Sequence, residues 1–142
     1  MRIDRGCAAA LAILALLAAG IVWCGYYLVS TTNREAQEVE AVIQTWLDRY
    51  NHEDFVTCYR SSDASLRALA TVEEYRENLS LMFAKSGPVT LVERRGFYVN
   101  TNNSIITATE QWESHSQLGS VNAVITLRKT DRWRIAAFML RP

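Results

Sequence analysis

The chain has 142 residues, which is enough for one domain with a hydrophobic core. Its 15 lysines and arginines balance its 15 aspartates and glutamates, so the formal net charge is zero. This balance gives no reason to expect nucleic-acid binding, which usually requires a basic surface. With only six glycines and two prolines, the chain also has no room for a low-complexity linker.

The first thirty residues differ in composition from the rest. An apolar run from Cys7 to Val29 contains no charged residue and is slightly longer than the about 20 apolar residues that span a bilayer. Two arginines precede the run, and aromatic residues stand near its far end, where their rings favour the headgroup level. The sequence therefore predicts a membrane anchor in residues 1–30. Its N-terminus is expected in the cytoplasm, and a domain of residues 31–142 is expected outside.

A cleaved signal peptide is the alternative for this segment. Small residues precede a possible cleavage point after Gly20. The apolar run continues for nine more residues, however, whereas the hydrophobic region of a signal peptide usually has about 7 to 15. The sequence favours an uncleaved anchor. It leaves open a secreted, soluble domain that begins near Gly20.

Two helices are predicted next. Apolar residues recur at spacings of three and four in residues 35–50, and Thr32 or Asn33 is suited to cap the start of this helix. A polar turn then precedes a short second helix in residues 55–60. Residues 61–65 are predicted to form a loop, because serines and an aspartate dominate them.

A third helix is predicted in residues 72–84. Thr71 and Glu74 have the spacing of a capping box, in which each side chain bonds the backbone of the other residue. Gly87 and Pro88 end the helix, since glycine accepts a positive φ and proline cannot continue a helix.

After this helix the hydrophobic period changes from 3.6 to 2, which is typical of strands. Four strands are predicted, in residues 89–99, 104–115, 120–129 and 132–140. The connections are so short that only antiparallel neighbours can be joined. The sequence therefore predicts an α+β chain: an N-terminal transmembrane helix, then three helices packed on a curved four-stranded antiparallel sheet.

This order of helices and strands resembles the nuclear transport factor two-like superfamily, a cystatin-like, cone-shaped α+β fold that also contains ketosteroid isomerases. The stretches WLDRYNHEDFVTCYRSSDAS and DRWRIAAFML also resemble an uncharacterised bacterial envelope family of that fold. The resemblance covers residues 35–142. It implies a conical domain with a space between helices and sheet, and an envelope location.

The resemblance to enzymes of this superfamily implies an active site inside the cone. There, a carboxylate base would face a tyrosine and a second acid. The candidates for such roles are Asp48, Glu110 and Tyr98, although no spacing forces two carboxylates together. Glu110 can instead be structural, in an ion pair with Arg95 or Arg128. The aromatic residues expected to line the cone as a ligand pocket are Trp46, Tyr50, Tyr59, Tyr75 and Trp112.

One short stretch holds His52, Glu53, Asp54 and Cys58, residue types that bind metals or act as nucleophiles. A helix that begins here would spread these side chains around its axis, and the spacings match no known metal motif. We expect no metal and no cofactor. Asp54 or Glu53 is expected to start the second helix. We expect Cys58 to be a small buried residue, with an intermolecular disulfide or a reactive thiol as alternatives.

Two functions follow from these expectations. The first is a non-enzymatic binding or assembly domain, anchored in the bacterial cytoplasmic membrane and facing outward. Trp112 or Trp133, exposed on the outer face of the sheet, would contact a protein partner or a second copy. The second is a small-molecule-binding protein or isomerase-like enzyme that uses the cone. An open pocket with convergent polar groups favours the second function, and a cone filled by aromatic side chains counts against it.

Overall fold

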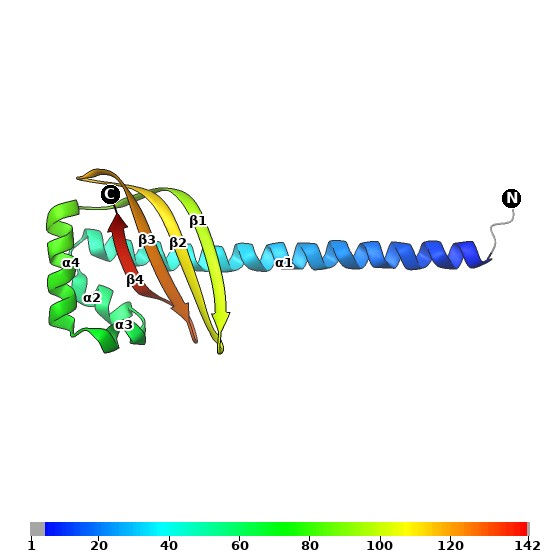
Figure 1. Cartoon of the computed structure of the whole chain (residues 1–142), viewed down its shortest axis with the longest axis horizontal. Helices are drawn as coiled ribbons and strands as arrows, with labels where there is room; N and C mark the ends of the chain where they lie inside the picture. The colour runs from blue at the N-terminus through cyan, green and yellow to red at the C-terminus, as the bar shows by residue number, and fades with distance from the viewer. Residues whose placement is uncertain (1–4, 142) are drawn as a thin grey trace. The chain divides into compact units, whose positions relative to one another are not determined.

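The computed structural model describes residues 5–141, and the side chains of residues 16–27, 30 and 33–141 among them. The chain divides into two units, Met1–Gln37 and Glu38–Pro142. Figure 1 shows the order of the elements along the chain. The described elements are α1 (Arg5–Asn51), α2 (Phe55–Ser61), α3 (Ala64–Leu69), α4 (Val72–Ser86), β1 (Thr90–Asn102), β2 (Ile105–Ser116), β3 (Gly119–Lys129) and β4 (Trp133–Arg141).

Helix α1 contains both the predicted anchor segment and the first predicted helix of the domain. It continues through positions 32 and 33, where we expected a new helix to begin, so that prediction is wrong. Neither proline nor glycine occurs in residues 26–50, and nothing in the sequence therefore interrupts the helix there. Residues 1–4 of the predicted anchor lie outside the described residues. Within the described part, no helix combines the length and the hydropathy of a membrane span.

The short helices are capped by acidic side chains. Asp54 accepts a hydrogen bond from the backbone N–H of Thr57 (3.2 Å), which confirms its predicted place at the start of α2. Asp63 accepts one from the backbone N–H of Ser65 (2.9 Å) and begins α3. The sequence did not predict α3, because this helix has only six residues and none of them is buried.

The capping box of α4 is present as predicted. The side chain of Thr71 accepts a hydrogen bond from the backbone N–H of Glu74 (3.3 Å), and the Glu74 carboxylate accepts one from the backbone N–H of Thr71 (2.8 Å). Gly87 follows α4 with φ of 62°, a conformation that glycine adopts easily. Its N–H donates to the carbonyl of Phe83, which closes the last turn.

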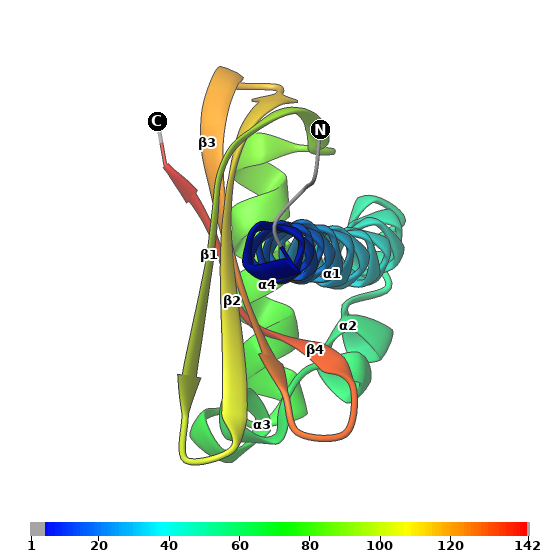
Figure 2. The same ribbon diagram turned by 90° about the vertical axis from the view of Figure 1, so that its right-hand side faces the viewer.

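The four strands form one antiparallel sheet in the order β1-β2-β3-β4. Each strand pairs with its neighbour in sequence, as the short connections predicted. Asn103 and Ser104 both have positive φ, which suits the twist of the tight β1–β2 hairpin. In the unit Glu38–Pro142, Figure 2 shows the helices on one face of this sheet, so the α+β part of the prediction is confirmed.

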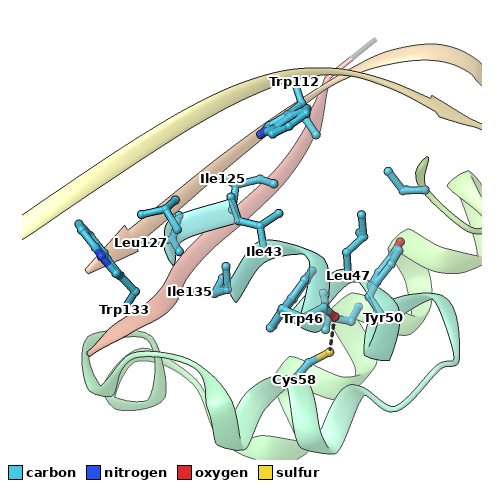
Figure 3. Close-up of a cluster of buried hydrophobic side chains, with 14 of the residues drawn as sticks. Ile43, Trp46, Leu47, Tyr50, Cys58, Trp112, Ile125, Leu127, Trp133 and Ile135 are labelled. Atoms are coloured by element: carbon cyan, nitrogen blue, oxygen red, sulfur yellow. Dashed lines mark hydrogen bonds between the residues drawn. The ribbon is translucent and has the colours of Figure 1, made fainter. Parts of the chain in front are cut away.

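The core lies between this face of the sheet and the helices (Figure 3). The alternation predicted for β3 is confirmed, since Val121, Ala123, Ile125 and Leu127 are all buried. Trp112 and Trp133 are also buried, with 7% and 5% of their surface exposed. The expectation that one of them is exposed on the outer face is therefore wrong. Both belong to the same buried cluster as the α1 residues.

Candidate functional site

Aromatic rings fill the region between the end of α1, the sheet and α4. Trp46 and Tyr50 are stacked, with ring centroids 5.7 Å apart and planes 9° from parallel. Phe138 from β4 lies 4.8 Å from Trp46, and Phe83 from α4 lies 5.4 Å from Tyr50. Such contacts add to the stabilisation that burial of the rings provides. Figure 3 shows Trp46, Leu47 and Tyr50 within this cluster of buried side chains.

The tyrosines that we expected to line a pocket are engaged in the fold. The hydroxyl of Tyr50 hydrogen-bonds that of Ser86 (3.1 Å), and the hydroxyl of Tyr59 donates to the carbonyl of Ala70 (2.9 Å). The rings of Tyr59 and Tyr75 are 5.5 Å apart. Burial raises the pKa of Tyr75 to about 12 and also raises the pKa of Tyr50. Both phenols are therefore neutral over the physiological range.

Glu110 is the one carboxylate among the three candidates that lies in the core, and none of its surface is exposed. One carboxylate oxygen accepts a hydrogen bond from the indole N–H of Trp112 (2.5 Å). The other lies 3.3 Å from a guanidinium nitrogen of Arg94, which also lies over the rings of Trp112 and Phe97. Burial raises the pKa of Glu110, and the Trp112 bond and the Arg94 charge oppose that rise.

The partner of Glu110 differs from the two arginines that we expected. Arg95 pairs instead with Glu93 and Glu113, and Arg128 pairs with Asp63. The reason is a pair of irregularities in β1. Register shifts occur between Leu91 and Glu93 and between Arg94 and Gly96, so strict alternation fails around Arg94. Arg94 therefore lies opposite Trp112 on the inner face.

The other two candidates lie away from this carboxylate. Asp48 is exposed on α1 and lies 3.5 Å from a ring nitrogen of His52, one turn further on. Tyr98 on β1 is 62% exposed. The structure therefore does not gather Asp48, Tyr98 and Glu110 into one catalytic group.

Cys58 is fully buried, as expected, and its thiol lies 3.7 Å from the carbonyl oxygen of Trp46. Burial raises the pKa of Cys58 to about 12, which keeps it in the unreactive thiol form. His52 is exposed and bonds the Asp48 carbonyl, so it does not activate this thiol. In the described part of the chain, no three histidine, cysteine or acidic side chains are grouped to hold a metal ion.

A groove lies beside this core, between α1 and the start of β4. Its volume is about 410 Å³, and its walls include Trp46 and Trp133. Three arginines also line it: Arg49 from α1, and Arg132 and Arg134 around the start of β4. Trp46 is thus the one predicted pocket residue on its walls. Sequence reasoning missed this groove. The only signal was the stretch DRWR, residues 131–134, where two arginines flank a tryptophan.

No protein-family model matches the sequence, and no curated protein matches it. The fold is similar to that of Bd1075 from Bdellovibrio bacteriovorus, with a TM-score of 0.52 and 12% identity over 80% of this chain. The match spans 42% of the length of Bd1075. A candidate dehydratase of the NTF2-like family from Streptomyces avermitilis matches 78% of this chain and 97% of its own length, with a TM-score of 0.51 and 12% identity. The chain therefore has the nuclear transport factor two-like (NTF2-like) fold that its order of helices and strands predicted.

Proposed function

We propose that this chain is a membrane-anchored protein whose C-terminal domain binds a protein partner, or a second copy, on the outer side of the bacterial cytoplasmic membrane. The anchor is inferred from the run without a charged residue between Cys7 and Val29. The described side chains in this run support it, because apolar residues there are exposed in the isolated chain. Those more than half exposed are Leu16, Leu17, Ile21, Val22, Trp23, Tyr26 and Tyr27.

The observation that carries the binding function is the filled interior of the domain. The packed rings of Trp46, Tyr50 and Phe138 occupy the region where an enzyme of this fold would hold its substrate. Opening a pocket there would separate these rings and expose apolar surface, which is unfavourable. A role that uses the outer surface of the domain does not require this exposure of apolar surface.

The exposed surface of the sheet supplies apolar groups for such a contact. Val92 and Tyr98 on β1 and Met139 on β4 are each between 42% and 62% exposed. These side chains replace Trp112 and Trp133 as the candidate contacts of the sheet. Because β1 and β4 are the two edges of the sheet, these side chains offer separate contact points and not one continuous patch.

Fractionation of cells that express the full chain with a C-terminal tag tests the anchor. The tag is expected in the membrane fraction after a carbonate wash, and accessible to protease only from outside the cytoplasm. A mature form that begins after Gly20 and is found in the soluble fraction would contradict the anchor. Crosslinking in intact membranes then tests the surface: Tyr98→Asp should remove a specific crosslinked product that Arg76→Asp, on exposed α4, leaves unchanged.

A second candidate function is acid–base catalysis by Glu110. The observation that favours it is the burial of this carboxyl beside Arg94, with a raised pKa that suits proton transfer. The similar Streptomyces protein is described as a candidate dehydratase, which is compatible with such chemistry. NMR of the Trp112 indole N–H, which donates to Glu110, tests this. A small molecule that enters the site should shift this resonance, and a library that leaves it unmoved counts against catalysis.

A further inference from the structure

The groove between α1 and the start of β4 combines arginines with buried aromatic walls. No aspartate or glutamate is among the described residues that line it, whereas Arg49, Arg132 and Arg134 all do. Its apolar walls include Val42, Trp46 and Trp133. The chain as a whole is neutral, so this local excess of positive charge is a property of the groove and not of the composition.

In the described part of the chain, neither Arg49 nor Arg132 takes part in a salt bridge within 4 Å. Arg134 pairs with Asp131 at 3.0 Å, but the Asp131 side chain is 65% exposed. A pair in which one partner is this exposed contributes little to stability. Three arginines thus line the groove with one close ion-pair partner, Asp131, and the more distant carboxylate of Asp54, which the charge of Arg49 influences.

The chemistry of these groups selects the occupant. Guanidinium groups bind carboxylates through paired, charge-assisted hydrogen bonds, and they recognise acidic motifs when several are close together. Arginine is also among the residues that most often dominate the free energy of protein–protein binding. Apolar side chains of the occupant would fit against Ala41 and Val42, which line the groove and are not buried, between the carboxylates held by the arginines.

The backbone of β4 limits how such an occupant is held. The carbonyl of Ile135, which lines the groove, already accepts a hydrogen bond from the backbone N–H of Asp63 (2.7 Å). A bound segment therefore does not extend the sheet at this point, and recognition depends on its side chains. From this arrangement we infer that the groove binds an acidic peptide segment of the partner protein, in which glutamates or aspartates alternate with apolar residues. This inference rests on the proposed binding function.

The test measures binding of a defined probe to the full chain in a neutral detergent. The probe is a fluorescein-labelled octapeptide in which glutamate and leucine alternate, and its counterpart has glutamine in place of each glutamate. Fluorescence anisotropy should show saturable binding of the acidic peptide that weakens as salt is added. The glutamine peptide should bind at least tenfold more weakly.

Two variants place the binding in the groove. Arg132→Ala and Arg49→Ala should each weaken binding of the acidic peptide about tenfold, the loss that truncation of an important interface arginine commonly produces. Arg76→Ala, an exposed arginine of α4, is the matched control and should bind as the wild type does. Circular dichroism of each variant verifies that the fold is retained. Should Arg49→Ala disturb α1, the exposed Arg132 still provides the test.

Three results would overturn the inference. Equal affinity for the two peptides would show that the carboxylates do not contribute to binding. Equal losses of affinity in Arg132→Ala and Arg76→Ala would show nonspecific electrostatic attraction and no binding site in the groove. Displacement of the peptide by phosphatidylglycerol vesicles, in a manner that depends on Arg132, would assign the groove to a lipid headgroup. If the groove does not bind the peptide, the fractionation and crosslinking tests of the proposed function keep their meaning. Conversely, peptide binding by a chain that fractionates as soluble supports the groove and contradicts the anchor.

Discussion

The ion pair of Arg94 and Glu110 provides a direct test of how the core tolerates a charge. Replacement of Arg94 by methionine keeps an unbranched apolar stem against Trp112 and Phe97 but removes the positive charge. Glu110 then remains fully buried with only the Trp112 N–H as a partner. At pH 7 we expect the free energy of unfolding to fall, because a buried carboxylate without a cation is strongly unfavourable.

The magnitude is limited by protonation. The ordinary pKa of a glutamate, 4.5, lies about 2.5 pH units below pH 7. Protonating the carboxyl at pH 7 therefore costs about 3.4 kcal/mol. The cost of the unpaired carboxylate does not exceed this value, since the folded chain can take up the proton instead. The Trp112 bond persists and the Arg94 side chain is 35% exposed, so part of the interaction is screened by water. We therefore expect a loss of about 2 kcal/mol at pH 7.

The sign of the pH dependence follows from the same pKa. Burial raises the pKa of Glu110 in the folded chain, and loss of Arg94 raises it further. Well below pH 4.5 the carboxyl is protonated in both the folded and the unfolded chain, so the cost of the unpaired charge disappears. The stability difference between wild type and Arg94→Met should thus be largest at neutral pH and decrease as the pH falls towards 4.5.

Urea denaturation followed by tryptophan fluorescence at pH 7 and pH 4.5 measures this difference. Arg95→Met is the matched control: the neighbouring arginine is exposed and pairs with Glu93 and Glu113, so we expect a loss below about 1 kcal/mol. Adding Glu110→Gln to Arg94→Met should restore most of the stability at pH 7. A loss in Arg94→Met that is the same at both pH values, or no larger than that of Arg95→Met, would refute this reasoning.

Three further changes test other parts of the fold by the same denaturation assay or by labelling. Thr71→Ala removes the cap of α4 and should cost about 1 kcal/mol, whereas Thr71→Ser should retain most of the stability. Tyr50→Phe removes the buried hydrogen bond to Ser86 and should also cost about 1 kcal/mol, and an unchanged urea midpoint would contradict that bond. With the other cysteines replaced by serine, Cys58 should resist alkylation at pH 8 until the chain unfolds, because it is fully buried and its pKa is about 12; rapid labelling of the native chain would contradict this.

The order of elements was predictable because each depends on local periodicity and capping. The helices of residues 55–60 and 72–84, the four strands and their antiparallel order all follow from patterns within about a dozen residues. The capping box of Thr71 is likewise encoded in four consecutive residues. Helix α3 was not predictable in this way. It has only six residues and buries none of them, so it leaves no apolar periodicity in the sequence.

The candidate sites were decided by contacts between segments far apart in the chain. Strict alternation would have placed Arg95 on the inner face of β1 with Phe97, but the register shifts there bring Arg94 to Glu110 instead. A bulge depends on the pairing of two strands, so the sequence of one strand does not reveal it. The groove likewise joins Arg49 to Arg132, which are separated by most of the domain in sequence. By itself the sequence determined the elements, their order and the apolar N-terminal run. Only tertiary packing decided which charges meet, because an ion pair or a groove requires side chains that lie close in space, whatever their separation along the chain.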